Sequence, residues 1–121
     1  MQQKILVIDD DESILEVIQI VLESAGYQIQ ISQSGECFQH FTNCCLPDLI
    51  LLDVLLSGED GREICKTLKR NQTTAHIPVV ILSALSDTSK LVDVSGADDF
   101  LEKPFDVDVL IETVEKHLLS A

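Results

Sequence analysis

The sequence predicts an α/β domain in which helices cover both faces of a parallel β-sheet. Strand-like and helix-like segments alternate five times along the 121 residues, joined by short links. Most of the strand-like segments are continuous apolar runs, as in strands buried on both faces. This alternation implies right-handed crossovers, which place parallel strands side by side. A chain of this length suffices for one domain with one core, and no linker, repeat or second domain is visible.

Five segments have the pattern of strands. Four are apolar runs, whereas the second alternates apolar and polar residues, which is typical of an edge strand. The expected strands are Lys4–Ile8, Tyr27–Ile31, Leu49–Leu52, Val79–Leu82 and Asp99–Leu101. Leu49–Leu52 is the most apolar and is therefore the expected central strand.

Apolar residues that recur every three or four positions indicate amphipathic helices between these strands. The expected helices are Glu12–Ala25, Gly35–Phe41, Arg62–Arg70, Ser86–Val94 and Val107–Leu119. Their expected inward-facing residues include Ile14, Ile18, Val21, Leu22 and Ala25 in the first, Ile64, Cys65 and Leu68 in the third, and Val107, Leu110, Ile111, Val114 and Leu118 in the last. Gly26 suits a left-handed C-cap. Ser57–Gly61 is expected to be a loop, in which Gly61 has a positive φ.

Composition limits the partners and the compartment. The net charge of −13 and the pI of about 4.3 oppose direct binding to nucleic acid or anionic lipid. No apolar run is long enough for membrane insertion. The first strand follows Met1 within three residues, so no signal peptide is expected, and we predict a cytoplasmic protein. The cysteines Cys37, Cys44, Cys45 and Cys65 form no CxxC motif and are expected to be reduced.

Polar residues stand where the predicted strands end. Asp9 and Asp10 follow the first strand, and Asp53 follows the central one. Ser83 ends the fourth strand, and Lys103 lies shortly after the fifth. The carboxyl ends of parallel strands meet at one edge of an open α/β sheet, where such sheets bind ligands. We therefore expect three carboxylates, a hydroxyl and an ammonium in one crevice.

These residue types match phosphoryl transfer. Three carboxylates repel one another unless a cation compensates them, and Mg²⁺ prefers a site with few carboxylates that also accepts a phosphate oxygen. A carboxylate can itself be the nucleophile that accepts the phosphoryl group, here Asp53. Ser83 and Lys103 can contact two of the phosphoryl oxygens.

The chain resembles the receiver domains of bacterial-type response regulators. The matching segments are "ILVIDDDE", "DLILLDVLLSGEDG", "VVILSA" and "GADDFLEKPF", which cover nearly the whole length in the family's order. The resemblance implies a receiver domain over residues 1–121 without an output domain. It also implies a doubly wound, five-stranded (βα)5 flavodoxin-like sheet with strand order 2-1-3-4-5.

The resemblance also implies a role for each site residue. Asp53 matches the phosphoacceptor, and Lys103 matches the lysine of the pocket, whose bond to Pro104 corresponds to a cis peptide in the family. Ser83 matches the switch hydroxyl and Phe100 the switch aromatic. The implied cofactor is Mg²⁺, with Mn²⁺ as a substitute. Its implied ligands are Asp9, Asp10, Asp53 and the backbone carbonyl of Leu55.

What the resemblance implies for function is a phosphorylation-dependent switch. A histidine kinase or a histidine phosphotransfer domain donates the phosphoryl group to Asp53. The surface of the fourth helix, last strand and last helix then changes and controls a downstream protein. The chain is not expected to be an enzyme beyond catalysing its own phosphorylation and at most a weak autophosphatase activity.

Three other functions are weighed against the switch. A phosphatase of the haloacid dehalogenase-like class also uses an Asp nucleophile with Mg²⁺, but needs an acid where Leu55 stands. An FMN carrier shares the architecture, but no Ser/Thr/Gly-rich phosphate loop follows the first strand. A receiver that binds partners without phosphorylation would not need all the site residues. Among the remaining acids, Asp11 suits an N-cap, and Glu59 and Asp60 are expected to be solvated loop residues.

The sequence departs from the family's pattern near the site. The loop after Asp53 reads Leu56-Ser57 where the family often has Met-Pro, and the segment from Ser83 to Lys103 is slightly shorter than usual. Leu55 and Leu85 replace polar side chains that often orient a hydrolytic water.

Because neither leucine can orient water, we predict a comparatively long-lived phosphorylated state. The loss of phosphate from the purified, phosphorylated protein measures this lifetime directly. Rapid spontaneous decay of the Asp53 phosphate would contradict the prediction.

Overall fold

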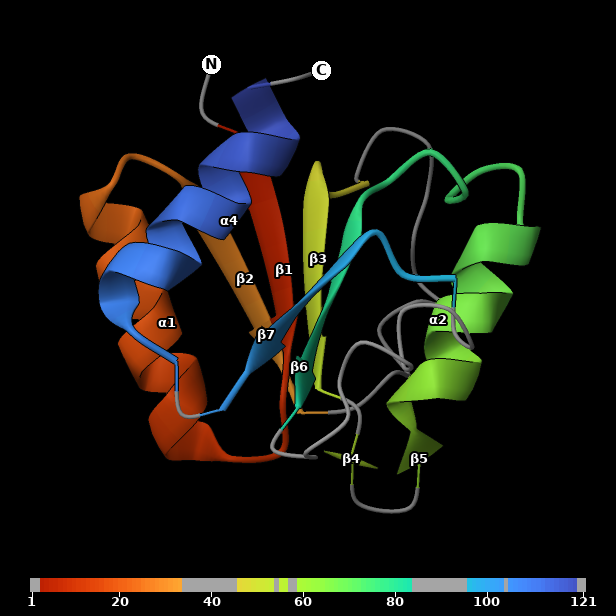
Figure 1. Cartoon of the computed structure of the whole chain (residues 1–121), viewed down its shortest axis with the longest axis horizontal. Helices are drawn as coiled ribbons and strands as arrows, with labels where there is room; N and C mark the ends of the chain where they lie inside the picture. Colours follow the sequence, from red (N-terminus) through yellow and green to blue (C-terminus); the bar gives the residue numbers. More distant parts are fainter. Residues whose placement is uncertain are drawn as a thin grey trace.

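A five-stranded parallel sheet forms the centre of the molecule (Figure 1). In the computed structural model, the described residues are 3–33, 46–53, 55–56, 59–83, 96–103 and 105–119. The strands of the sheet are β1 (Lys4–Ile8), β2 (Gln28–Ser32), β3 (Leu49–Asp53), β6 (Val79–Ser83) and β7 (Asp99–Glu102). Their spatial order is β2-β1-β3-β6-β7, which confirms the predicted order 2-1-3-4-5.

Burial of the strands follows their place in the sheet. Every residue of β3 and β6 is buried, as expected for the inner strands of a sheet covered on both faces. The edge strand β2 pairs only with β1 in this sheet, and Ile31 near its end is 41% exposed. The predictions that Leu49–Leu52 is central and that the second strand lies at an edge are therefore confirmed.

The helices divide between the two faces of the sheet. Helices α1 (Glu12–Ser24) and α4 (Val107–Leu119) cover one face, and α2 (Gly61–Arg70) covers the other (Figure 1). Alternate residues of β1 point to opposite faces: Ile5 and Val7 pack with α1 and α4, whereas Leu6 and Ile8 pack with α2. The core thus consists of two aliphatic layers separated by the sheet.

Helix α1 begins as predicted. The Asp11 side chain is its N-cap and accepts a hydrogen bond from the Ser13 amide at 2.9 Å. Gly26 follows the helix with φ of 101°. Leu15, Ile18 and Leu22 are the buried residues, and Ile14 and Val21 are partly buried against them. Ala25 is exposed, contrary to prediction, because it is the C-cap and lies past the last turn that packs on the sheet.

Helix α4 packs through fewer residues than expected. Leu110, Val114 and Leu118 are buried, and Ile111 is partly buried. Val107 is 42% exposed, so its predicted inward position is wrong. It opens the helix, and the buried contacts of the helix begin only at Leu110.

The segment before α2 is more regular than the predicted loop. Leu55–Leu56 (β4) and Glu59–Asp60 (β5) form a short antiparallel pair. Asp60 is the N-cap of α2, and its side chain accepts hydrogen bonds from the Arg62 amide and guanidinium. Asp60 is therefore not simply a solvated loop acid. Gly61 is the first residue of the helix and does not have the predicted positive φ, because the cap makes this position helical.

Some predictions concern residues outside the described ranges. The expected helices Gly35–Phe41 and Ser86–Val94 lie there, together with Cys37, Cys44 and Cys45. The remaining cysteine, Cys65, is buried on the inner face of α2, as predicted. Among the described helices, none is long and apolar enough to cross a membrane.

Asp99 connects β7 to α4. One of its carboxylate oxygens lies 3.0 Å from His117 Nε2 and 3.4 Å from Lys116 Nζ. Its other oxygen accepts a hydrogen bond from the Phe100 amide at 2.8 Å. Burial would raise the pKa of Asp99, but these hydrogen bonds and the Lys116 charge together lower that pKa below its usual value of 3.8.

Because the folded-state pKa of Asp99 is depressed, its contribution to stability is present above pH 3.8 and is lost as the pH falls through the folded-state pKa. We expect Asp99→Asn to lower the free energy of unfolding by about 1–2 kcal/mol at neutral pH. The difference from wild type should shrink below pH 3.8. Urea unfolding of both proteins, from neutral pH to below pH 3.8, measures this difference in the free energy of unfolding. Glu102→Gln, which removes an exposed charge from the same strand, is the control and should unfold at the same urea concentration as wild type at neutral pH.

Candidate functional site

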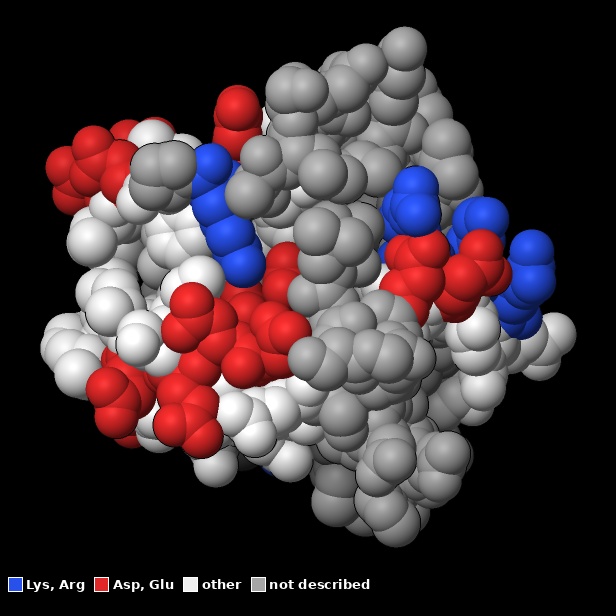
Figure 2. Space-filling view, turned by 90° about the horizontal axis from the view of Figure 1, so that it is seen from below, with Lys and Arg blue, Asp and Glu red and all other residues white. Residues whose placement is uncertain are grey.

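The polar residues predicted to converge lie at the carboxyl edge of the sheet. Asp53 is the last residue of β3, and Ser83 is the last residue of β6. Asp9 directly follows β1, and Lys103 directly follows β7. The strands are in register here, with Ile8 opposite Leu52 and Asp53 opposite Leu82. Figure 2 views the molecule from this edge and shows acidic side chains gathered there.

Three aspartates form the centre of the site. Carboxylate oxygens of Asp9, Asp10 and Asp53 all lie within 4.8 Å of one another. Asp9 is fully buried, Asp53 is 5% exposed, and Asp10 is exposed. Two of the three carboxylates, those of Asp9 and Asp53, are therefore buried, and that of Asp10 is open to solvent.

Asp9 is held from two sides. Its Oδ1 accepts a hydrogen bond from the Asp11 amide at 2.9 Å, and its Oδ2 accepts one from Lys103 Nζ at 2.7 Å. These two bonds fix the orientation of a fully buried carboxylate. The Asp11 amide is a site group that the sequence prediction missed, because side-chain types do not indicate main-chain donors. An Asx-type turn ahead of a helix was the available signal.

Lys103 provides the positive charge of the site. Its Nζ lies 2.7 Å from Asp9 Oδ2 and 3.3 Å from Asp53 Oδ1, and its side chain is 16% exposed. Burial would lower the pKa of Lys103, but the hydrogen bond to Asp9 and the charges of Asp53 and Asp9 raise it above its usual value. The lysine is therefore an ammonium at neutral pH.

The charge balance of this cluster suits a divalent cation. Three carboxylates face one ammonium among the described residues, so the cluster keeps an excess of negative charge. Oxygen ligands are those that Mg²⁺ prefers, and it usually binds through a few carboxylates while keeping water ligands. The exposed Asp10 leaves a side of the cluster open to such waters. The residues present therefore fit Mg²⁺.

The other predicted site residues are placed around this centre. Ser83 is fully buried, and its carbonyl accepts a hydrogen bond from the Lys103 amide at 2.7 Å. Phe100 lies within β7 and packs, partly buried, against the core layer that includes α2. The main chain of Leu55 belongs to β4 and pairs with that of Asp60. Leu85 and Pro104 lie outside the described residues.

The amino end of β7 is also anchored. Asp98 Oδ2 accepts a hydrogen bond from Lys69 Nζ of α2 at 2.6 Å and another from the Val79 amide of β6 at 2.9 Å. Lys69 Nζ further donates to the Ile77 carbonyl at 2.8 Å. This network joins α2, β6 and β7 at the edge opposite the aspartates, and so positions the strand that carries Lys103.

The family model described as the response regulator receiver domain matches residues 5–115. A DNA-binding dual master transcriptional regulator of Synechocystis sp., RpaA, is 42% identical over 113 residues, which cover 92% of this chain and 47% of that protein. The chain belongs to the receiver domain family of two-component response regulators. It spans about half the length, or less, of the curated relatives it matches first.

Solved structures agree in fold over nearly the whole chain. A putative response regulator from Chloroflexus aurantiacus has a TM-score of 0.90 and 34% identity, and the match covers 98% of this chain and 99% of that one. The receiver domain of the Pseudomonas aeruginosa sensor histidine kinase PA1611 has a TM-score of 0.85 and 24% identity, with 98% of both chains covered. That structure has a magnesium ion coordinated in the active site cleft.

Removing one carboxylate from the cluster should affect stability differently with and without metal. Without Mg²⁺, we expect Asp10→Asn to unfold at the same temperature as wild type or higher, because it relieves repulsion. At a Mg²⁺ concentration about ten times the dissociation constant, wild type should gain about 1.4 kcal/mol, whereas the variant should gain much less. Thermal unfolding with and without Mg²⁺ measures both effects.

Glu112→Gln is the matched control for this experiment. It removes one exposed negative charge on α4, outside the cluster, and should leave the Mg²⁺ response unchanged. An equal Mg²⁺ response in Asp10→Asn and wild type would mean that this cluster does not bind the ion.

Proposed function

We propose that this chain is a phosphorylation-dependent signalling switch, in which Asp53 accepts a phosphoryl group from a histidine of a kinase or a phosphotransfer protein. The observation that carries the proposal is the convergence of Asp53 with Asp9, Asp10 and Lys103 at the carboxyl edge of the sheet. The match to the receiver family over residues 5–115 supports the same conclusion.

The transfer is a nucleophilic substitution at phosphorus. A carboxylate oxygen of Asp53 attacks the phosphorus atom while the bond between phosphorus and the donor's imidazole nitrogen breaks. The product is an acyl phosphate on Asp53, and the electron pair of the broken bond stays with the imidazole. Lys103, whose Nζ lies 3.3 Å from Asp53 Oδ1, is the proposed partner of one phosphoryl oxygen, and the Ser83 hydroxyl is the proposed donor to another.

The proposed ligands of Mg²⁺ are Asp9, Asp10, Asp53 and the backbone carbonyl of Leu55, with Mn²⁺ as a substitute. When bound, the ion would neutralise negative charge on the carboxylates and on the incoming phosphoryl group. The carboxylate cluster and the magnesium ion in the cleft of the PA1611 receiver support this assignment. Asp9 has the additional role of holding Lys103 beside Asp53.

The proposed output involves Ser83 and Phe100. Ser83 moves toward the phosphate, Phe100 turns into the space that this movement leaves, and the surface that includes β7 and α4 changes. Asp99 supports this proposal, because its contacts with His117 and Lys116 already join β7 to α4 on that surface.

The downstream partner is proposed to be a protein. RpaA is described as DNA-binding, but this chain covers only 47% of it, and the charge of −13 opposes direct contact with nucleic acid. The chain is proposed to act as a switch and not as a phosphatase, because Leu55 stands where an acid would be needed for phosphatase turnover.

Incubation with Mg²⁺ and acetyl phosphate tests the function. We expect wild type to incorporate one phosphoryl group, detected by mass spectrometry, and chelation of Mg²⁺ to abolish incorporation. Asp53→Asn should reduce incorporation to background, because the nucleophile is gone. Asp11→Asn should retain it, since asparagine caps a helix about as well as aspartate.

Two outcomes would contradict the proposal. Repeated release of phosphate over many turnovers would favour the phosphatase. Failure to incorporate phosphate, in a protein that binds Mg²⁺, would favour a receiver that binds partners without phosphorylation.

A further inference from the structure

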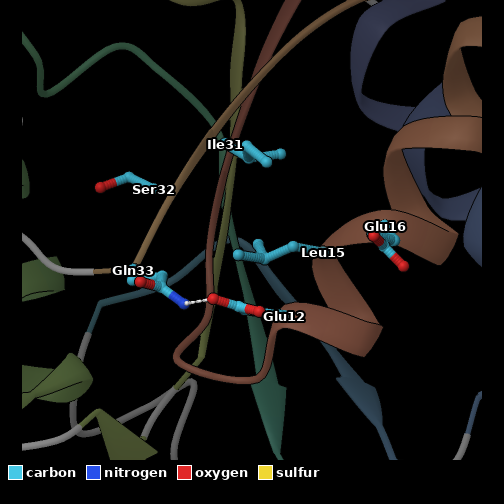
Figure 3. A pocket seen from close by; sticks show the side chains of 6 residues that line it. All are labelled: Glu12, Leu15, Glu16, Ile31, Ser32 and Gln33. Carbon is cyan, nitrogen blue, oxygen red and sulfur yellow. Dashed lines mark hydrogen bonds between the residues drawn. The ribbon is translucent and has the colours of Figure 1, made fainter.

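A groove lies on the surface where α1 packs beside the edge strand β2 (Figure 3). It has a volume of about 380 Å³, and its described lining residues are Glu12, Leu15, Glu16, Ile31, Ser32 and Gln33. None of them is among the carboxylate cluster or Lys103. The groove is therefore a concave surface distinct from the candidate phosphorylation site.

The floor of the groove is apolar. Leu15 points from α1 toward the strands, and Ile31 points from β2 toward α1 (Figure 3). Leu15 is buried in the core, but Ile31 is 41% exposed and is one of the few large apolar side chains that the described surface leaves open to water. An aliphatic side chain placed here would cover Ile31 and remove apolar surface from water.

The helical wall of the groove is acidic. Glu12 and Glu16 lie one turn apart on α1, and both are exposed. Glu12 Oε1 accepts a hydrogen bond from Gln33 Nε2 at 3.2 Å, and neither glutamate forms a salt bridge with any residue that the structure describes. Helix α1 itself contains no lysine or arginine. These two negative charges beside an apolar floor favour a partner with basic side chains.

We propose that this groove binds a basic amphipathic helix of a partner protein. An aliphatic side chain of that helix covers Ile31 and Leu15, and neighbouring lysine or arginine side chains pair with the carboxylates of Glu12 and Glu16. Charge complementarity supports this occupant, because a purely apolar segment would leave both glutamates unpaired. A metal ion alone would leave Ile31 exposed.

The proposed docking does not depend on phosphorylation. The groove is formed by α1 and the end of β2, not by β7 and α4, whose surface is the one proposed to change on phosphorylation. Binding should therefore be the same before and after wild type is treated with acetyl phosphate and Mg²⁺, and the failure of either proposal would leave the other intact.

Titration of ¹⁵N-labelled protein with a synthetic helical peptide of leucine and arginine tests the proposal. The peptide carries its leucines on one face, and Mg²⁺ is kept at saturation to mask the three aspartates. We expect the largest chemical-shift changes at residues 12–16 and 31–33. A peptide with glutamate in place of arginine should not bind.

Variants of the groove provide the decisive comparison. The double variant Glu12→Gln/Glu16→Gln should weaken peptide binding about tenfold, as expected for two exposed ion pairs. Ile31→Ser should also weaken binding, through the apolar floor. Glu112→Gln, which removes an exposed charge on α4, should bind like wild type.

Other results would overturn the proposal. If the double variant binds the peptide as tightly as Glu112→Gln does, the attraction comes only from the overall charge of the protein. Shift changes centred on α4 and β7 would place the peptide on another surface. Circular dichroism of each variant shows whether it is folded.

Discussion

The ammonium of Lys103, in contact with both Asp9 and Asp53, is the interaction on which the candidate site depends. Asp9 is fully buried and Asp53 nearly so, and two adjacent carboxylates at such depth would be costly without a compensating charge. Lys103 also joins β7 to the strands that carry the aspartates. One side chain therefore balances the charge of the site and connects β1, β3 and β7 at the same edge.

Much of this arrangement could be predicted from the sequence, because it follows from topology. Once β1, β3, β6 and β7 are parallel neighbours, residues at their carboxyl ends must share an edge, however far apart they lie in the chain. Asp9 and Lys103 are separated by 94 positions and still form a hydrogen bond. Continuous apolar runs indicate strands that are buried on both faces, and β3 is indeed buried along its whole length. These runs therefore identified the strands whose carboxyl ends form the shared edge.

Local hydrogen bonds were harder to predict. Asp60 was expected to be solvated, yet it caps α2 and pairs with Arg62, and the glycine after it is helical. An N-cap aspartate followed three residues later by a glutamate, here Asp60 and Glu63, is typical of a helix start. An acid in a segment that contains glycine is equally typical of a loop, so the pattern did not decide between the two. Val107 fits the apolar stripe of α4, but periodicity does not show where along a helix packing begins. Which main-chain amide orients Asp9 could not be read from residue types.

The anchoring of Asp98 has a mechanical consequence for β7. At its amino end the strand is held by a carboxylate that binds both α2 and β6, and at its other end Lys103 is held by charges that phosphorylation would alter. Between these two ends the strand is also paired with β6 along its whole length, and the Lys103 amide donates to the Ser83 carbonyl. A change in the charge around Asp53 would therefore reach β7 through the Lys103 side chain, at the end of the strand farthest from the Asp98 anchor.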